Sequence, residues 1–323
     1  MAGVVLATLL NACATVPPAL RTLDHSTLPP RVELTDTPFF PQTRFHCGPA
    51  ALATVLTHHN VATTPDALAQ QLYIPRLKGS LQAEMVAAAR DFEIIALEFE
   101  RDLSALLEEV ANGTPVLVMQ NLGLKWLPRW HYAVVVGYDL ADRTIVLRSG
   151  KRKRWVTPLT VFDRTWRRGG QWALLIVPPD HIPVNIDAPA FVSAASALES
   201  TGHTAAAHTA YRTATRRWPD NGHAYMGLGN TAYTLHDHEL AAQAFARRIA
   251  LDPQSPHGWN NLAYPLIERG CAALAIEAAR CAVRLAPDDD NYRHTLDEIE
   301  TLAATATTSA DANCTAPVCP AAR

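Results

Sequence analysis

The 323-residue sequence has no surplus of basic charge, few cysteines and no long apolar run. Its 28 Lys and Arg residues stand against 31 Asp and Glu, a net charge of -3. This argues against nucleic acid as the main partner, because phosphate binding needs a basic field. Six cysteines are too sparse for a disulfide scaffold. What is left is a globular composition and a length that suits two domains.

Two further absences exclude classes of chemistry. No glycine-rich loop followed by a lysine is present to hold a phosphate, so we expect no ATPase within this sequence. The histidines do not cluster with acids or cysteines at ligand-like spacing. We therefore expect no metal site and no cofactor.

The N-terminus is an apolar run, MAGVVLATLLNACA, too short to cross a bilayer as a helix and typical of a secretory signal. Leu10-Asn11-Ala12-Cys13 resembles the lipobox of bacterial lipoproteins, in which the cysteine receives the lipid. The resemblance implies a mature chain that begins at Cys13. It would be lipid-anchored in the cell envelope, favouring the periplasmic face of the outer membrane over the inner membrane. An ordinary signal peptide or a cytosolic apolar start is the alternative.

Changes of composition divide the chain. The expected segments are a signal or lipobox (1–13), a flexible leader (14–36), a first domain (37–179), a linker (180–189), a repeat domain (190–305) and a disordered tail (306–323). In the first domain, helical patterns over 48–58 and 80–91, with Ser80 as a cap, precede runs typical of strands. These runs are 93–98, 115–120, 132–138, 144–148 and 172–177. The order predicts an α+β domain with a mostly antiparallel sheet.

The second domain has an internal period of 34 residues, marked by Pro219, Pro253 and Pro287. The same register places aromatic residues in the first helix of each unit and alanines where two helices pack closely: Phe191, Tyr225 and Trp259, then Ala207, Ala241 and Ala275. The pattern resembles the tetratricopeptide repeat. It implies an all-α solenoid of three repeats with a cap helix over 288–304 and a surface for a protein partner.

A cysteine begins a predicted helix in the stretch FFPQTRFHCGPAALA, residues 39–53. A thiol nucleophile reacts as the thiolate, which a helix N-terminus favours. Cys47 has this position. Gln42 stands five residues before it, where a side-chain amide can donate to an oxyanion together with the backbone N–H of the nucleophile. The alternative is a cysteine that packs as a small apolar residue.

The general base has to come from elsewhere in the fold. His131 stands at the start of the strongly β-forming run WHYAVVVGYD, residues 130–139. A sheet can present an imidazole to a neighbouring helix from such a position. A strand-end histidine that faces water is the alternative.

The two stretches QTRFHCGPAALATVL and HYAVVVGYD together resemble the papain-like peptidases that cleave bacteriocin leader peptides after a double glycine. The resemblance covers roughly residues 38–178. By motif it implies that Cys47 is the nucleophile, Gln42 the oxyanion residue and His131 the general base. It also implies a peptide or protein substrate.

The third catalytic member departs from the family, which usually has an Asp followed by Pro after the histidine strand. Asp139 is eight residues along the same strand, about 26 Å from His131 at ~3.3 Å per residue, and cannot orient its imidazole. Folding the hairpin back brings Arg148, Ser149 and Gly150 opposite His131 instead. Ser149 could accept a hydrogen bond from the imidazole, while Arg148 would disfavour an imidazolium. The site then works as a Cys–His dyad helped by Ser149, or it has lost activity.

Three weaker features leave alternatives open. The basic cluster over 151–154 with Arg148 is a solvated face, or it meets an acidic substrate or lipid headgroups. Trp126, Trp130 and Trp155 line a peptide groove or belong to the core. Cys314 and Cys319 lie in the expected disordered tail and could pair with each other in an oxidising compartment.

Together these features predict a cysteine peptidase that hydrolyses peptide bonds by a Cys–His mechanism, with a repeat domain that binds protein. The alternative is a catalytically inactive, peptidase-like protein that binds peptides or assembles partners in the cell envelope.

Overall fold

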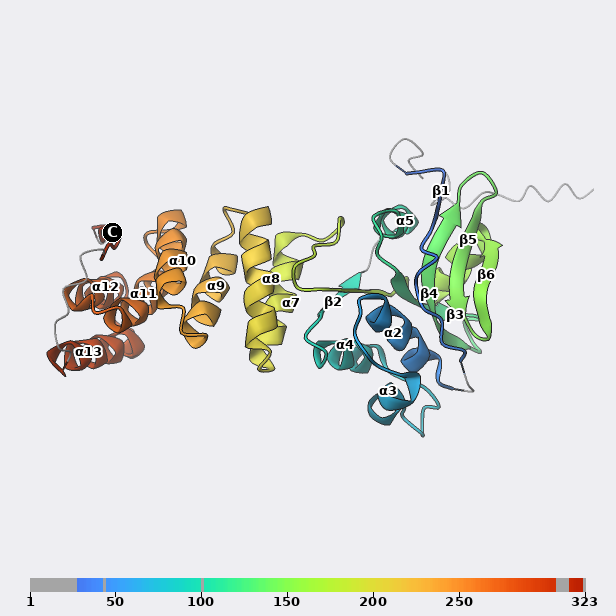
Figure 1. Ribbon diagram of the computed structural model, residues 1–323, viewed down its shortest axis with the longest axis horizontal. Helices are drawn as coiled ribbons and strands as arrows, with labels where there is room; N and C mark the ends of the chain where they lie inside the picture. The colour runs from blue at the N-terminus through green and yellow to red at the C-terminus, as the bar shows by residue number, and fades with distance from the viewer. Residues whose placement is uncertain (1–27, 43–44, 100–101, 306–313, 322–323) are drawn as a thin grey trace, which may run out of the picture.

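The computed structural model describes residues 28–42, 45–99, 102–305 and 314–321. An α+β domain lies at one end, and a row of stacked helices leads away from it (Figure 1). The predicted order of an α+β domain followed by tetratricopeptide helices is confirmed.

The first domain is built on an antiparallel sheet. Its elements are β1 (Arg31–Glu33), α2 (Cys47–His58), α3 (Pro65–Leu72), α4 (Gln82–Arg90), β2 (Ile95–Phe99), α5 (Leu103–Ala111), β3 (Val116–Asn121), β4 (Trp130–Asp139), β5 (Thr144–Ser149), β6 (Arg152–Pro158), α6 (Leu159–Arg168) and β7 (Ala173–Val177). The strand order is β2-β7-β3-β4-β5-β6, and β1 pairs with β4. All five predicted strands are present, within two residues of their predicted bounds.

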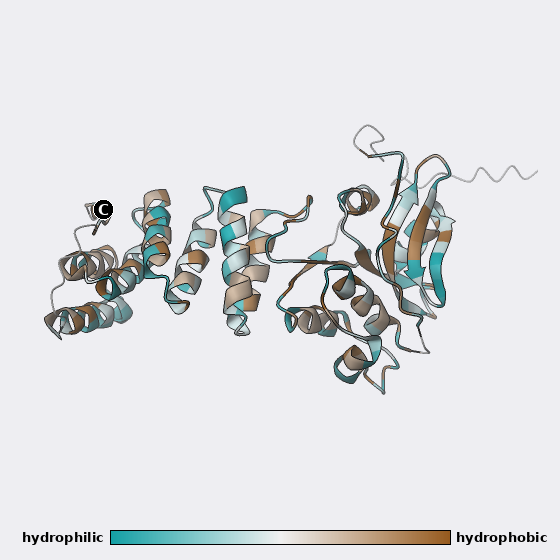
Figure 2. Cartoon of the chain, viewed as in Figure 1, coloured by the Kyte–Doolittle hydropathy of each residue, from teal (hydrophilic) through white to brown (hydrophobic). Residues whose placement is uncertain are grey.

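Alternation along the central strands divides the core into two layers. On β4, Tyr132 and Val134 face a cluster formed with α2, α3 and α4, while Ala133 and Val135 face a cluster formed with α5 and α6. Figure 2 shows hydrophobic colour along the central strands and hydrophilic colour on the edge strand β6. Helix α2 therefore lies flat on the sheet with its first residue close to the start of β4.

Part of the predicted flexible leader belongs to this domain. Residues 31–33 form β1, and Leu28 is buried in the core. Gly137 allows this pairing, since a Cβ there would lie 2.5 Å from the carbonyl oxygen of Val32. The predicted Ser80 cap is also wrong: α4 begins after Leu81, and the buried Ser80 Oγ has no hydrogen-bond partner. The physical reason is that Ser80 follows directly on the bridge between Ile74 and Gly79, one residue before the N-cap position, which Leu81 occupies.

The second domain is a stack of antiparallel helices. They are α7 (Ala188–Ser200), α8 (Thr204–Arg217), α9 (Gly222–Thr234), α10 (His238–Leu251), α11 (Pro256–Glu268), α12 (Ala272–Leu285) and α13 (Asp290–Thr305). The predicted close-packing alanines Ala207, Ala241 and Ala275 are all fully buried. In α9, Gly229 leaves room for the Phe245 ring of α10, because a Cβ there would lie 2.4 Å from it.

The two domains share one core. Phe191 and Leu198 of α7 belong to the same buried cluster as Ile95 and Leu97 of β2. The connecting segment is held as well: the buried Glu109 carboxylate accepts hydrogen bonds from the backbone N–H groups of Val184 and Asn185, at 3.3 and 2.8 Å. The segment predicted as a linker is packed against the first domain.

Two disulfides fasten residues 314–321 to the last repeat. They join Cys271 to Cys314 and Cys281 to Cys319, each with 5.8 Å between the Cα atoms. The predicted pairing of Cys314 with Cys319 is wrong. Cys271 caps helix α12 and Cys281 lies within it, a little under three turns later, and the returning chain crosses both. This part of the predicted disordered tail is therefore covalently attached to the repeat stack.

Candidate active site

Cys47 is the first residue of α2 and packs beside Tyr132, close to the start of β4. The preceding turn is tight, because Phe45 has a left-handed backbone with φ of 70°. Gly48 allows a close approach of the loop before α4, since a Cβ there would lie 2.8 Å from Ser80 Oγ. The thiol is partly buried against the core layer that contains Tyr132, and Cys47 is the one free cysteine among the described residues.

Burial raises the pKa of the Cys47 thiol above its ordinary value. The backbone N–H groups of Tyr132, Gly48 and Cys47 itself act in the opposite direction, by stabilising the thiolate, but burial outweighs them. The helix N-terminus therefore supplies donors for the anion without making the thiolate the resting form.

His131 and Ser149 lie in contact across the hairpin that follows β4. The imidazole Nε2 lies 2.7 Å from Ser149 Oγ, and Ser149 is only 1% exposed. Between Leu147 and Ser149 the register of β5 with β6 shifts, at the point where the strand reaches the site. Within the described part of the chain, Nδ1 of His131 has no hydrogen bond, and none joins its ring to Cys47.

Burial, with a smaller effect from the Arg129 guanidinium, lowers the pKa of His131 to about 4. The imidazole is therefore neutral at pH 7, as a general base needs to be. Arg148, which we expected to oppose the imidazolium, points elsewhere: its guanidinium donates to the carbonyl oxygens of Thr37 and Lys153, at 3.2 and 2.7 Å. The positive charge beside the imidazole comes from Arg129, which the sequence argument missed.

Gln42 is held beside the start of β4 by three hydrogen bonds. Its backbone N–H donates to the carbonyl oxygen of Gly150 at 2.9 Å, and its Oε1 accepts from the Gly150 N–H at 2.9 Å. Its Nε2 donates to the carbonyl oxygen of Tyr132 at 3.2 Å. One Nε2 hydrogen is left over, because a primary amide has two. Gln42 thereby connects the His131 strand to the turn after Ser149.

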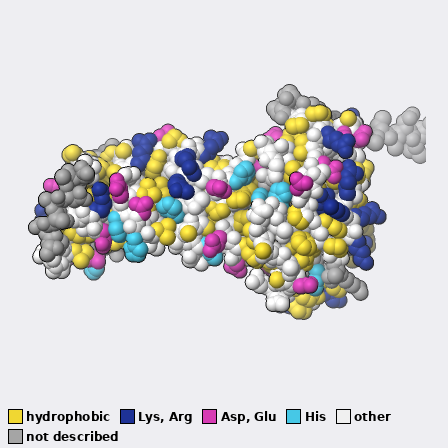
Figure 3. All heavy atoms as spheres, in the orientation of Figure 1, with side chains coloured by type: hydrophobic (Ala, Val, Ile, Leu, Met, Phe, Trp, Pro, Cys, Tyr) yellow, Lys and Arg dark blue, Asp and Glu magenta, His cyan; other side chains and the backbone are white. Residues whose placement is uncertain are grey.

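The other expected residues lie as follows. Asp139 is on the same strand as His131, as we expected from the spacing. Its Oδ2 lies 3.8 Å from Arg31 Nε. Trp155 packs partly buried against the core, whereas Trp126 and Trp130 are exposed. Cys13 lies outside the described residues. Lys and Arg side chains gather over the edge of the sheet formed by β5 and β6 (Figure 3).

Buried groups near the site were not visible in the sequence. Gln120 is the cross-strand partner of His131, and its Nε2 donates to Thr165 Oγ1 at 2.6 Å. The Tyr132 hydroxyl donates to the carbonyl oxygen of Ser80 at 3.2 Å. Both hydrogen bonds join segments that are 45 or more residues apart, so no local sequence pattern predicts them.

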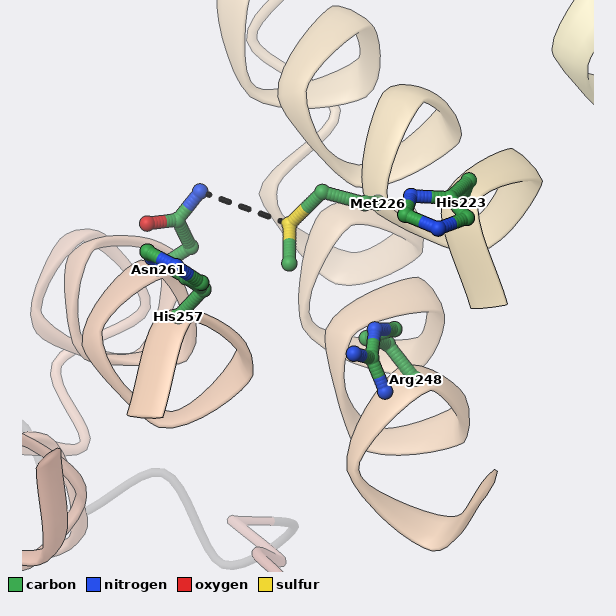
Figure 4. A pocket seen from close by; sticks show the side chains of 5 residues that line it. All are labelled: His223, Met226, Arg248, His257 and Asn261. Atoms are coloured by element: carbon green, nitrogen blue, oxygen red, sulfur yellow. Dashed lines mark hydrogen bonds between the residues drawn. The ribbon is translucent and has the colours of Figure 1, made fainter. Parts of the chain in front are cut away.

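The repeat stack has a groove of its own, with a cavity of about 230 Å³ between α9, α10 and α11. Its lining residues are His223, Met226, Arg248, His257 and Asn261 (Figure 4). Asn261 Nδ2 lies 3.6 Å from Met226 Sδ and donates to Asn230 Oδ1 at 3.0 Å, and Arg248 pairs with Asp252 at 3.2 Å. The groove offers imidazole and amide groups to a ligand on the repeat surface.

Two features are absent from the described residues. No group of three or more His, Cys, Asp or Glu side chains there is placed to hold a metal ion. None of the helices in the described ranges has the length and apolar character required to span a membrane.

Comparison with known proteins divides the chain at the same place as the fold. Residues 34–174 match the model of the Peptidase C39 like family, and residues 192–256 match a tetratricopeptide repeat model. The chain therefore joins a C39-like peptidase domain to tetratricopeptide repeats. Among curated proteins, Protein FlbA of Caulobacter vibrioides is 36% identical over 94 residues, 29% of this chain. The match spans about a sixth of that relative, 16% of its length.

Solved structures are similar to each half. A structure assigned as a C39-like peptidase from Bacillus anthracis is 17% identical, with TM-score 0.39, and covers 46% of this chain and 97% of its own. The peptidase domain of Streptococcus ComA, a bi-functional ABC transporter, is 20% identical, with TM-score 0.37, and covers 44% and 98%. The first tetratricopeptide domain of Spaghetti, bound to an HSP90 peptide, is 14% identical, with TM-score 0.35, and covers 38% and 99%.

Proposed function

We propose that the chain is a cysteine peptidase whose Cys47 and His131 hydrolyse a peptide bond. The observation that carries the proposal is the 2.7 Å contact between His131 Nε2 and Ser149 Oγ. It fixes the ring through one nitrogen and leaves Nδ1 for the thiol proton. Ser149 thus takes the orienting position that an aspartate has in the related peptidases.

In the proposed reaction, Cys47 Sγ attacks the substrate carbonyl carbon while His131 Nδ1 takes the thiol proton. The second Nε2 hydrogen of Gln42 and the Cys47 backbone N–H donate to the oxyanion. The intermediate collapses to a thioester, and His131 returns the proton to the leaving amine. Water, deprotonated by His131, then attacks the thioester carbonyl, and the released Cys47 sulfur takes back a proton from the imidazolium. The resemblance to leader peptidases suggests cleavage after a double glycine.

The test uses the full chain with iodoacetamide, followed by mass spectrometry at Cys47, and a Gly-Gly peptide substrate. Because the resting pair is a neutral thiol and a neutral imidazole, we expect alkylation, which needs the thiolate, to rise with pH through neutrality. Hydrolysis, which needs only the neutral imidazole of His131, should rise as the pH passes about 4 and change little through neutrality. His131→Ala should reduce hydrolysis by about 10²- to 10⁴-fold, and Cys47→Ala should abolish it. His208→Ala is the matched control in the repeat domain. Hydrolysis that is absent in the wild type, or that does not fall in His131→Ala, would refute the peptidase.

A peptidase-like protein without activity is the second candidate. The raised pKa of Cys47 and the missing hydrogen bond between Cys47 and His131 favour it. In that case the first domain binds a peptide without cleaving it. Binding of a labelled peptide that is equal in wild type and in Cys47→Ala, without any product, would support this candidate.

We also propose that the protein acts outside the cytoplasm, anchored to a bacterial membrane through Cys13, and binds a protein partner through its repeats. The two disulfides support an oxidising compartment, since cytosolic thiols are kept reduced. Incorporation of labelled lipid that is lost in Cys13→Ala tests the anchor, and wild type that stays unlabelled and soluble refutes it.

A further inference from the structure

One stretch of the chain, residues 143–171, has a large excess of positive charge. It contains nine Lys or Arg residues and a single acid, Asp163, which pairs with Arg167 at 2.9 Å. With these removed from the totals of 28 and 31, the rest of the chain has 19 basic and 30 acidic residues. A charge asymmetry of this kind is typical of a segment that meets a nucleic acid or a membrane.

Some of these charges are used inside the fold. Arg148 is buried and donates to backbone carbonyl oxygens, and Arg168 donates to the carbonyl oxygen of Asn121 at 3.1 Å. Arg154 pairs with Glu33. Four others are exposed and have no acidic partner among the described residues: Lys151, Arg152, Lys153 and Arg164. We call these four side chains the basic face.

The basic face spans two elements that pack together. Three of its residues lie on the edge strand β6 or directly before it, and Arg164 is on α6, which follows β6 at once. Trp155 of β6 packs against the core cluster that contains Phe162 and Trp166 of α6. Basic side chains on an edge strand alone would be explained as protection against pairing with another strand. That explanation does not extend to Arg164 on the helix.

Two exposed valines accompany the charges at the end of the molecule away from the repeats (Figure 3). Val156 is two residues beyond Arg154 on β6 and is 39% exposed. Val161 is in the first turn of α6, three residues before Arg164, and is 43% exposed. Apolar side chains within a basic field match the surface of a bilayer, where anionic headgroups lie over acyl chains.

The N-terminal part of the chain enters the domain next to the basic face. The described residues begin at Leu28, β1 follows, and Glu33 of β1 bonds to Arg154 of β6 at 2.9 Å. Cys13, the position of the proposed lipid anchor, is 15 residues before Leu28. An extended chain of this length spans at most about 50 Å. A membrane that held Cys13 would therefore be within reach of the basic face.

We propose that the basic face docks the first domain on a membrane surface of anionic phospholipids. The inference goes beyond the proposed peptidase function and does not depend on it. A lipid surface fits better than an acidic protein, because the chain approaches its proposed anchor from the same side and exposed valines accompany the charges. The two disulfides favour an oxidising compartment and so argue against nucleic acid.

Docking on this face has a consequence for the candidate site. Gly150, which is bonded to Gln42 through both its N–H and its carbonyl oxygen, directly precedes Lys151. Ser149, the partner of His131, is one residue earlier. The docked domain would therefore hold the candidate site close to the lipid headgroups.

The test measures the partition of the full chain onto vesicles by sedimentation, in a Cys13→Ser background that cannot receive a lipid. The vesicles contain phosphatidylglycerol and phosphatidylcholine in equal parts, or phosphatidylcholine alone. We expect binding to the anionic vesicles only, and weaker binding as salt is added. The triple variant Arg152→Gln, Lys153→Gln and Arg164→Gln should partition roughly 100-fold less, because each basic side chain near the surface contributes about fivefold.

The matched control removes the same charge from the repeat domain, at Arg212→Gln, Arg216→Gln and Arg284→Gln. These side chains are also exposed, and their loss should leave the partition nearly unchanged. Equal weakening in the two triple variants, or equal partition onto both kinds of vesicle, would overturn the proposal. Binding to polyglutamate that is lost in the first triple variant, with no binding to vesicles, would overturn it in favour of an acidic protein.

The same samples separate this inference from the peptidase. Cleavage of the Gly-Gly peptide is measured without vesicles. Binding to anionic vesicles without any cleavage would support the membrane surface and reject the peptidase alone. Cleavage without binding to anionic vesicles would reject the membrane surface alone.

Discussion

The peptidase-like domain and the repeat domain bury their polar groups in opposite ways. In the first domain, Arg148 and Ser149 are nearly inaccessible and bond to partners far along the chain, at Thr37 and His131. In the repeats, the buried polar residues are short hydroxyl side chains, such as Thr231, which donates to the Gly227 carbonyl oxygen of its own helix. Partners far along the chain thus fix the polar groups of the candidate site, whereas the buried hydroxyl groups of the repeats bond within their own helix.

The same contrast holds for the nonpolar core. The sheet domain packs large aliphatic side chains on both faces, whereas the repeat stack packs alanines and glycines against aromatic rings. Each repeat contacts mainly its neighbours, so its stability is close to a sum of local terms. We expect mutations in the two halves to behave differently for this reason.

The largest expected effect is on the repeat half, when both disulfides are removed by Cys314→Ser with Cys319→Ser. The disulfides close loops with sequence separations of 43 and 38 residues. Each should contribute about 2–4 kcal/mol to the free energy of unfolding. Denaturant unfolding of the double variant checks this, with the alkylation rate of Cys47 as the control. If the double variant also changed the alkylation rate of Cys47, the repeat half would not respond independently of the sheet domain, contrary to this prediction.

A smaller loss is expected from Arg148→Met in the sheet domain. Arg148 is 4% exposed, and its guanidinium donates to backbone carbonyl oxygens of Thr37, Leu34 and Lys153, which would lose their partner. We expect the free energy of unfolding to fall by about 2–3 kcal/mol. The matched control is Arg154→Met on the exposed edge, where Arg154 pairs with Glu33 and a much smaller change is expected. Equal losses in the two variants would refute the role of the buried bonds.

The smallest expected effect is that of Gly229→Ala in the repeat half. The added Cβ would lie 2.4 Å from the Phe245 ring, and overpacking of this kind costs about 1–3 kcal/mol. The higher helix propensity of alanine offsets up to about 1 kcal/mol of this loss. Gly222→Ala is the control, because its Cβ meets only the flexible Arg248 side chain at 3.0 Å. Thermal unfolding of both variants measures the difference, and equal midpoints would show that the ring can move aside.

Periodic features of the sequence could be predicted well. The 34-residue register identifies the repeats because one proline, one aromatic and one alanine position recur at the same offset in each unit. Five of the seven strands in the described part of the sheet domain were predicted from their β-branched runs, whereas β1 and the basic β6 were not. The β1 strand could not be predicted in this way, because three residues carry too little pattern and the pairing depends on the missing Cβ of Gly137.

The candidate site was predictable in part. Cys47, Gln42 and His131 stand in motifs, and the hairpin length brings Ser149 toward His131 by counting alone. The direction of Arg148 was not predictable, because the register shift near the end of β5 and the β1 segment decide where its guanidinium finds acceptors. The partners of Cys314 and Cys319 were also beyond reach, since they depend on the path of the returning chain.

Periodicity and short motifs in the sequence predict the order of an α+β domain and repeat helices, the repeat register and the candidate residues Cys47, Gln42 and His131. Only the tertiary structure decided which His131 nitrogen is held by Ser149, and which tryptophans face solvent. Both depend on segments that are distant along the chain. The positions of these segments follow from packing, which cannot be predicted from a local sequence pattern.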